Sequence, residues 1–380
     1  MSVWKVEMTT LSIIGCGFVA DLYMRSLRTF PDVQVAAVYD RNADRAAAFA
    51  SHWGVKTVTS EAELYSGMKP PGLVLNLTNP DAHFEVNKAV LDAGHHVYSE
   101  KPLAMKMDEA QALYDLAGSQ DLLIASAPCS VLGEAAQMLG KALRQNIGGR
   151  PRLIYAELDD GFIPQAPHQD WISPSGAPWP SEDEFRTGCT VEHAGYYLSW
   201  LIAHFGAVER VVAASGRTIP DLLPEGSAAD TSVATLFFKD GLMARLTCSI
   251  VGPHDHRLRI IGDKGVLCVK EAWKNSAPVT FFKRVQMRRR LIDLPVGRRI
   301  KPKGKTHPKV ERWGAAEMNF ALGPVEMLQA IRDKRSCRLS ADFALHLNEV
   351  TLAIQNAGRD GVARDMTTSC EPMEPMPWAL

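Results

Sequence analysis

Three short stretches of the chain combine residue types that could hold a phosphate-containing ligand and move a proton. The first is a glycine turn at residues 15–20, which follows a short apolar run. The second ends in Lys101, and the third is a helix-like stretch that contains Glu192 and Tyr196. Free backbone amides after a glycine turn can bind phosphate, and an amine, a carboxylate or a phenol can exchange a proton. The stretches therefore pair an anion site with acid–base groups, if the fold brings them together.

The glycine turn occurs in the order of elements that a dinucleotide-binding unit requires. An apolar run stops at Gly15, and helix-like residues follow Ala20. Gly15 permits the tight turn, Gly17 lets the backbone approach a pyrophosphate, and Ala20 keeps the helix close to the strand. A second apolar run ends in Asp40, whose carboxylate can accept hydrogen bonds from an adenosine ribose. The expected cofactor-binding residues here are Gly15, Cys16, Gly17, Phe18, Val19, Asp40 and Arg41.

Asp40 also favours NAD over NADP. A carboxylate repels the additional 2′-phosphate of NADP. Arg41 follows directly and could stack on the adenine or, as the less favoured alternative, bind that phosphate. We therefore expect NAD as the cofactor.

Strand-like and helix-like stretches alternate over the first third of the chain. The strand-like runs lie at residues 11–14, 33–39, 55–58, 73–78, 96–99 and 122–127, with helix-like stretches after the glycine turn and at 43–53, 83–93 and 107–118. This alternation predicts an α/β fold with a doubly wound parallel sheet. Ligands of such folds bind at the carboxyl ends of the strands. That edge adds to the cofactor-binding set Thr78, Asn79, His83, Glu100 and Lys101.

The pattern changes after about residue 129, which predicts a second domain. A helix at 134–144, a Pro/Gly/Trp-rich loop at 161–182 and a helix at 190–205 alternate with strand-like runs at 153–158, 208–215, 232–239, 242–250, 257–261 and 266–270. Hairpin-like spacing predicts an α+β domain with an open, mostly antiparallel sheet. Irregular structure is expected at 283–312, and helices at 319–332 and 342–358. The expected domains are residues 1–128 and 129–380, with the last helix packing back on the first domain.

Composition excludes several classes of function. The chain has 380 residues, 46% hydrophobic and 22% charged, and a formal net charge of −1, which argues against nucleic-acid or anionic-membrane binding by the whole chain. It has no run long enough to span a membrane, and its first ten residues lack the pattern of a secretory signal. Seven scattered cysteines fit reduced thiols. We expect a cytoplasmic protein.

Two further patterns favour ordinary structural explanations. His254 and His256 could form a metal pair, but without a third evident ligand a structural role is favoured, so no metal site is expected. The Lys/Arg-rich run at 283–312 could bind a phosphate or an anionic glycolipid. A solvated basic loop is the favoured interpretation.

The chain resembles the Gfo/Idh/MocA family of NAD(P)-dependent sugar oxidoreductases. The resemblance rests on the glycine turn that leads to Asp40, on the tripeptide Glu100-Lys101-Pro102, on residues 188–196, and on residues 339–342 before the last helix. It implies an N-terminal Rossmann domain and a C-terminal substrate-binding domain.

The third motif departs from the commonest family pattern. An Asp and a His four residues apart are usual in the family, whereas here the pair is Glu192 and Tyr196. Some members use Tyr at the second position. His193 is one residue out of register and should point about 100° away from Glu192 on a regular helix. A distortion at the start of the helix could still place His193 on the same side as Glu192.

The resemblance implies catalytic roles for Lys101, Tyr196 and Glu192. Partial burial and an oxidised nicotinamide would lower the pKa of Lys101 toward that of a general base. Tyr196 would bond the reacting oxygen, its own pKa lowered by Lys101, and Glu192 would hold Lys101 or a substrate hydroxyl. The alternatives are a strand-end lysine in a salt bridge, and an aromatic core stripe that includes Tyr196.

A carbohydrate is the expected partner. Indole rings suit the apolar faces of a sugar, so the expected substrate-binding residues are Lys101, Trp171, Trp179, Glu192, His193 and Tyr196. The loop that carries Trp171 and Trp179 could equally be a lid or a subunit contact. The expected activity is NAD-dependent oxidoreduction at a ring carbon of a sugar. A redox-neutral NAD-dependent glycosidase and a non-catalytic sugar or cofactor sensor are the alternatives, and the family likeness implies a homodimer or homotetramer.

Overall fold

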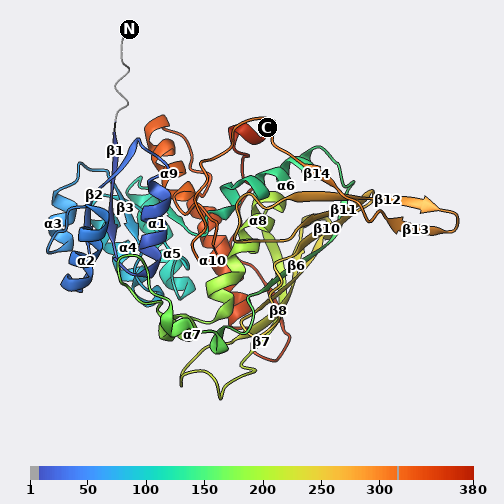
Figure 1. Ribbon diagram of the computed structural model, residues 1–380, viewed down its shortest axis with the longest axis horizontal. Coiled ribbons are helices and arrows are strands. Elements are labelled where there is room, and N and C mark those ends of the chain that lie inside the picture. The colour runs from blue at the N-terminus through green and yellow to red at the C-terminus, as the bar shows by residue number, and fades with distance from the viewer. Residues whose placement is uncertain (1–7, 315) are drawn as a thin grey trace, which may run out of the picture.

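The computed structural model describes residues 8–314 and 316–380 and contains two β-sheets with helices between them (Figure 1). Most of the segment in which we looked for a secretory signal lies outside the described residues. Within them, no helix is both long and apolar enough to cross a bilayer. All seven cysteines are free.

The first sheet is parallel and five-stranded, in the order β2-β1-β3-β4-β5. This confirms the predicted doubly wound α/β unit. Its central strands β1, β3 and β4 are almost wholly buried, which is why they read as apolar runs in the sequence. The strands are β1 (Thr9–Ile14), β2 (Val33–Tyr39), β3 (Leu73–Asn76), β4 (His96–Ser99) and β5 (Ile124–Ser126).

The prediction of a strand at residues 55–58 was wrong. The segment forms only an isolated bridge between Val38 and Thr57. Two backbone hydrogen bonds make this bridge: the Val38 amide donates to the Lys56 carbonyl, and the Val58 amide donates to the Val38 carbonyl. Val58 alone among its residues is buried, so the segment has too little apolar surface to extend the sheet. The helices of this half are α1 (Phe18–Leu27), α2 (Ala43–Trp53), α3 (Glu61–Ser66), α4 (His83–Asp92) and α5 (Met107–Ser119).

The second sheet has ten strands and is mostly antiparallel, as predicted; its one parallel pair is β6 with β9. Its order is β13-β12-β11-β10-β6-β9-β8-β7-β15, with β14 beside β12. The strands are β6 (Pro151–Asp159), β7 (Val208–Gly216), β8 (Thr231–Phe238), β9 (Met243–Ser249), β10 (Leu258–Gly262), β11 (Gly265–Val269), β12 (Val279–Met287), β13 (Arg290–Asp293), β14 (Arg298–Ile300) and β15 (Ala363–Asp365).

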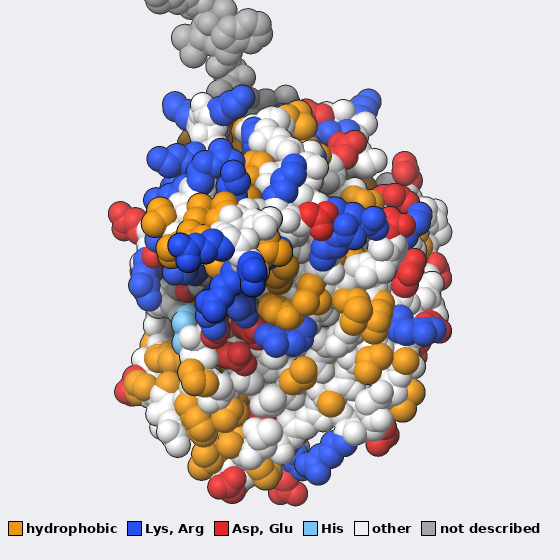
Figure 2. All heavy atoms as spheres, turned by 90° about the vertical axis from the view of Figure 1, so that its right-hand side faces the viewer, with side chains coloured by type: hydrophobic (Ala, Val, Ile, Leu, Met, Phe, Trp, Pro, Cys, Tyr) orange, Lys and Arg blue, Asp and Glu red, His pale blue; other side chains and the backbone are white. Residues whose placement is uncertain are grey.

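The basic segment at 283–312 is less irregular than we expected. Strand β12 continues to Met287 and forms a hairpin with β13, closed by an ion pair between Arg284 and Asp293 (2.9 Å). The hairpin projects from the end of the sheet in Figure 1, and Figure 2 shows Lys and Arg side chains gathered among apolar ones at that end of the molecule. Charged residues interrupt the apolar ones in both strands, and β13 is mostly exposed, which hid the strand periodicity in the sequence.

Helix α10 lies between the two sheets, where it contacts α5 and β5 on one side and β7 and β8 on the other (Figure 1). Asp342 accepts a hydrogen bond from the Tyr114 hydroxyl (2.7 Å), and Asn348 accepts one from the Ala104 amide (3.3 Å).

The expected domain boundary between residues 128 and 129 stays a prediction. The helices of this half are α6 (Glu134–Arg144), α7 (Ser181–Thr187), α8 (Gly195–Phe205), α9 (Leu322–Asp333) and α10 (Ala341–Gln355), with a π-helical turn, η5 (Thr190–Ala194), before α8.

Candidate active site

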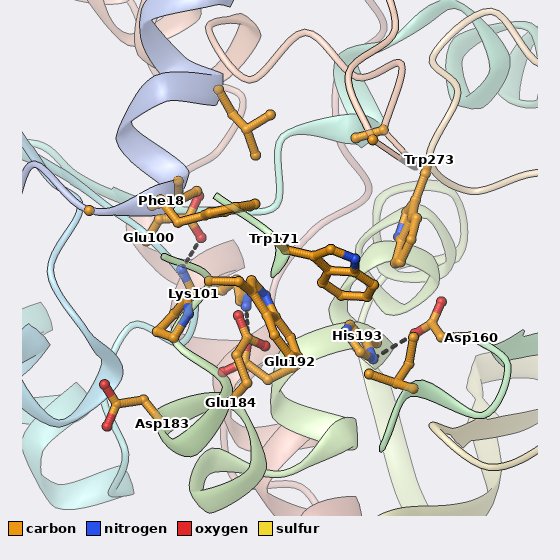
Figure 3. Close-up of a pocket in the computed structure, with 18 of the residues that line it drawn as sticks. Phe18, Glu100, Lys101, Asp160, Trp171, Asp183, Glu184, Glu192, His193 and Trp273 are labelled. Carbon is orange, nitrogen blue, oxygen red and sulfur yellow. Dashed lines mark hydrogen bonds and ion pairs between the residues drawn. The ribbon is translucent and has the colours of Figure 1, made fainter. Parts of the chain in front are cut away.

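A cavity of about 760 Å³ lies where the carboxyl ends of the first sheet meet the second half of the chain (Figure 3). It brings together the predicted residues Gly17, Phe18, Val19, Thr78, Asn79, Glu100, Lys101, Trp171, Trp179, Glu192, His193 and Tyr196. It does not include Gly15, Cys16, Asp40, Arg41 or His83 in its lining. The cavity thus joins the glycine turn to the three candidate acid–base residues.

The two turn glycines have different structural requirements. Gly15 has a positive φ of 96°, and a Cβ built there would lie 2.5 Å from the carbonyl oxygen of Leu77 in the neighbouring strand end. Gly17 has ordinary extended angles, and a Cβ there would have no heavy atom within 4 Å. Gly17 is also the N-cap of α1 without a side-chain cap, so the first amides of the helix remain available to an anion.

Asp40 supports the glycine turn from the end of β2. One carboxylate oxygen accepts the Cys16 amide (2.9 Å) and the other accepts the Asn42 amide (2.8 Å). Arg41 is exposed, and Arg45 lies 3.8 Å from the Asp40 carboxylate. The open cradle at Gly17, the uncapped helix and this carboxylate fit the phosphates and ribose of a dinucleotide.

His83 does not line the cavity, and its expected contact with the cofactor stays a prediction. Its ring is fully buried, and its two nitrogens lie 2.6 Å from the Pro102 carbonyl and 2.9 Å from the Thr78 carbonyl. His83 therefore ties together the two strand-end loops that carry Thr78 and Lys101.

Lys101 lies at the centre of a cluster of carboxyl groups. Its ammonium forms an ion pair with Glu192, whose side chain is 4% exposed. The Glu100 carboxylate accepts the Lys101 amide (3.0 Å) and the Tyr23 hydroxyl (2.6 Å), which holds the backbone of Lys101 at the edge of the sheet. Glu184, from α7, faces the same ion pair in Figure 3. The salt bridge of Lys101 is thus with Glu192 inside the cavity, and not the alternative of a surface salt bridge with Glu100 or Asp40.

The protein's own groups raise the pKa of Lys101, opposite to the lowering that we expected from burial. Burial acts to lower it, but the charge of the Glu192 carboxylate, the nearest of the acidic groups around the ammonium, outweighs burial, so the pKa lies above the ordinary lysine value. The pKa of Tyr196 is raised by burial despite the opposing charge of Lys101. Both groups are therefore proton donors at neutral pH.

Glu184 is a carboxyl group that keeps its proton. Burial raises its pKa well above the ordinary value, and a hydrogen bond shared with Glu192 raises it further. The Glu184–Glu192 pair holds one proton because two adjacent carboxylates would repel. The spacing analysis missed Glu184, since Ser181–Thr187 reads as a short surface helix.

Replacing Glu184 by glutamine should flatten the pH dependence of stability. The folded pKa of Glu184 exceeds its ordinary value of 4.5, so the folded protein retains a proton that the unfolded chain releases. The ionisation of Glu184 therefore lowers the free energy of unfolding as the pH rises from about 4.5 toward the raised pKa. Glutamine does not ionise, so the variant should not show this decrease. Urea unfolding between about pH 5 and pH 8 measures the slope.

The exposed neighbour Glu182 supplies the control, Glu182→Gln, which should follow the wild-type slope. If Glu184→Gln also follows it, Glu184 is ionised in the folded protein.

The π-helical turn η5 explains how His193 enters the cavity with Glu192. A regular helix would separate the two side chains, but the wider turn at Thr190–Ala194 changes their register before α8 begins. His193 Nδ1 lies 2.6 Å from an oxygen of Asp160. Tyr196 and His193 both pack edge-on against Trp273, with ring centroids 6.4 and 6.0 Å apart. The distortion that could recruit His193 is therefore present.

The aromatic loop at 161–182 is fastened to the first turn of α1. Trp171 and Trp179 pack at 5.0 Å and form part of the cavity wall. Buried Asp21 accepts hydrogen bonds from the Ser175 amide (3.1 Å), the Ser175 hydroxyl (2.7 Å) and the Trp53 indole (2.9 Å). This anchor places the two indoles over the cavity.

Substitution of Asp21 by alanine should raise the KM for the substrate by roughly tenfold and leave kcat within about twofold, because three hydrogen bonds that hold the loop are lost. Limited proteolysis within residues 161–182 should become faster. Asp44→Ala, at the exposed first turn of α2, is the matched control. Unchanged KM and proteolysis in the Asp21 variant would show that the loop is held by its other contacts.

Several cavity residues have no signal in the sequence. Trp273, Trp313, Met318 and Phe320 come from loops late in the chain, and Asp160 directly follows β6. The Trp313 ring packs on Phe18 of the glycine turn (5.0 Å). Nothing in their local spacing indicates that they share a cavity with residue 18.

Comparisons with known proteins agree with this arrangement. Residues 10–127 match the family model described as the oxidoreductase family, NAD-binding Rossmann fold, of Gfo/Idh/MocA proteins. Residues 137–268 match the Gfo/Idh/MocA C-terminal domain. The first match includes the glycine turn and Lys101, and the second includes Glu192 and Tyr196.

Similar proteins include enzymes of sugar and polyol chemistry. An uncharacterized oxidoreductase of Synechocystis is 26% identical over 271 residues, 68% of this chain and 70% of the relative. The myo-inositol 2-dehydrogenase of Thermotoga maritima is 22% identical over 265 residues, 67% of this chain and 73% of the relative. The structure of UDP-N-acetylglucosamine 3-dehydrogenase from Acidithiobacillus ferrooxidans has a TM-score of 0.69 at 20% identity, over 92% of this chain and 98% of that chain, and shows the shared fold. The chain belongs to the Gfo/Idh/MocA family of oxidoreductases.

Proposed function

We propose that this protein is an NAD-dependent dehydrogenase that transfers a hydride between nicotinamide and a ring carbon of a sugar or sugar derivative. The observation that carries the proposal is the placement of Lys101, Glu192 and Tyr196 in one cavity with the open glycine turn. The family membership and the inositol and sugar dehydrogenases among its relatives support it.

Lys101 and Tyr196 act on the oxygen of the reacting carbon. When a carbonyl is reduced, the raised pKa values of both groups keep a proton available for that oxygen. When an alcohol is oxidised, the Lys101 ammonium gives one proton to the Glu192 carboxylate and takes the hydroxyl proton in its place as the hydride leaves the carbon. Bound NAD supplies the hydride acceptor, and its positive ring charge lowers the pKa of Lys101 in that direction. Glu192 holds the ammonium in place.

The cavity favours a sugar without phosphate or carboxylate groups. Its lining includes six acidic residues and a single lysine, and none of its described residues is an arginine. Phosphates and carboxylates are commonly bound by arginine. Trp171 and Trp179 supply apolar surface for the face of a sugar ring.

We assign NAD rather than NADP on the basis of Asp40, whose carboxylate opposes a 2′-phosphate. Assembly into a homodimer or homotetramer through the open face of the second sheet stays a prediction from the family likeness.

One observation favours a second candidate, a redox-neutral NAD-dependent glycosidase. Elimination of a glycosidic substituent needs a group that can protonate the leaving oxygen. Glu184 is a carboxyl group that retains its proton inside the cavity. Transient oxidation of the sugar followed by elimination and re-reduction would consume no net NAD.

The deciding experiment incubates the protein and NAD with sugars, nucleotide sugars and glycosides while reduced-nicotinamide absorbance and released sugar are both measured. Accumulating NADH with one class of neutral sugar supports the dehydrogenase. Released aglycone without accumulating NADH supports the glycosidase. NAD binding without turnover of any compound contradicts both and leaves a sensor.

A further inference from the structure

A chain of ionisable side chains borders the cavity on the side away from Lys101. Asp160 is fully buried, and its two oxygens lie 2.6 Å from His256 Nε2 and 2.6 Å from His193 Nδ1. His256 Nδ1 lies 2.8 Å from Glu271, and the exposed His254 lies 3.5 Å from the other Glu271 oxygen. In Figure 3, Asp160 and His193 face each other beyond Trp171, on the opposite side from Lys101.

The bonding of this group is incomplete. Asp160 Oδ2 and His193 Nδ1 lie within ion-pair distance, but both are buried without a hydrogen bond from any described residue. A fully buried carboxylate oxygen without a donor is costly. A positively charged ligand at this point would remove that cost.

We propose that Asp160, His254 and His256 bind a divalent transition-metal ion, with zinc the best fit. One donor atom from each residue lies within 4.8 Å of the other two. Two imidazoles and one carboxylate are a usual zinc set, in which donors around one ion are about 3.3 Å apart. His254 closes that gap by rotating, since its side chain is 52% exposed. The sequence analysis lacked a third ligand, because Asp160 is about a hundred residues away from the histidine pair.

Glu271 provides the outer support that metal-bound histidines usually have. By accepting from His256 Nδ1, it turns the opposite nitrogen, Nε2, toward Asp160. The Trp273 amide donates to the same Glu271 oxygen (3.0 Å), which fixes the carboxylate. Nε2 now shares a proton with Asp160 Oδ1 at 2.6 Å, so a zinc ion bound between the two residues would release that proton and widen the contact.

The proposed metal site opens into the cavity. Asp160 and His254 both belong to its lining, so three protein ligands leave a coordination position that faces the substrate space. A divalent ion would also offset the six acidic residues around one lysine. If the proposed function is right, that open position takes a hydroxyl oxygen of the sugar and orients the ring. The metal site itself does not depend on the proposed function.

The test is zinc binding by the whole protein without cofactor or substrate. After dialysis against EDTA, titration calorimetry at about pH 8 and elemental analysis should give one zinc per chain with a Kd of roughly micromolar or below. Zinc should raise the unfolding temperature, and cobalt should give the visible absorption of a four- or five-coordinate site. His254→Gln changes an exposed ligand and should weaken zinc binding at least tenfold.

His52→Gln, an exposed histidine on α2, is the matched control and should bind zinc as the wild type does. Asp160→Asn should also lose binding, and its unfolding temperature without metal reports whether it folds. Failure of the wild type to bind stoichiometric zinc, or unchanged affinity in His254→Gln, would overturn the proposal. A change in the cobalt spectrum on addition of a sugar tests the substrate role separately: no change, with zinc still bound, rejects that role alone.

Discussion

Replacement of Lys101 by methionine is expected to lower kcat by about 10³-fold, within the range usual for loss of a positioned acid–base group. Methionine retains the length and apolar stem of the side chain but removes the ammonium that Glu192 holds in the cavity. The Lys101 amide donates to the Glu100 carboxylate, and His83 holds the carbonyl of the next residue, Pro102, so the backbone is fixed through bonds that do not involve the Lys101 side chain. The cofactor should therefore bind nearly as well as before, and turnover should be lost.

The measurement is kcat and KM on the sugar identified in the panel, with NAD affinity from quenching of tryptophan fluorescence. Lys106→Met is the control, because Lys106 is a 69% exposed lysine paired with Glu109 outside the cavity, and it should change neither quantity. Lys101→Arg keeps the charge, and should retain substrate affinity better than methionine while restoring little turnover. Less than tenfold loss of kcat in Lys101→Met would remove Lys101 from the chemistry and leave it as a salt-bridge residue of the cavity wall.

The placement of Lys101 could be predicted from the sequence, whereas its protonation could not. Parallel strands end at one edge of a sheet, so the runs before Gly15, Thr78 and Glu100 were enough to place those residues together. The direction of the Lys101 pKa depends instead on how closely acidic groups surround it, Glu192 first and then Glu184, which reaches the cavity from α7. Local spacing contains no information on a contact of that kind.

Errors in the predicted elements have similar causes. Residues 55–58 have the composition of a strand, but only Val58 finds apolar surface, so a single bridge forms. The β12–β13 hairpin pairs strands that are largely exposed, and exposed strands do not need the apolar alternation by which strands are detected. The π-helical turn at Thr190–Ala194 was foreseen only as a distortion that could admit His193.

A matched pair of glycine substitutions should separate folding from cofactor binding. In Gly15→Ala, the new methyl group meets the Leu77 carbonyl oxygen at 2.5 Å and the backbone keeps a φ of 96° that alanine rarely adopts. Relief of that contact requires β1 and the end of β3 to move apart. The free energy of unfolding should fall by about 3 kcal/mol or more, the sum of backbone strain and overpacking.

Gly17→Ala adds the same methyl group two residues later with the opposite outcome. Its Cβ meets no heavy atom within 4 Å, and its φ of −81° suits alanine, so stability should stay within about 1 kcal/mol of wild type. The methyl group enters the space in which the backbone must approach a pyrophosphate, and the Kd for NAD should rise at least tenfold. Urea unfolding and NAD titration of both variants measure the two effects. Wild-type NAD affinity in a folded Gly17→Ala protein would mean that the cofactor phosphates do not lie against this turn, although the space beside Gly17 is open and the first amides of α1 have no side-chain cap.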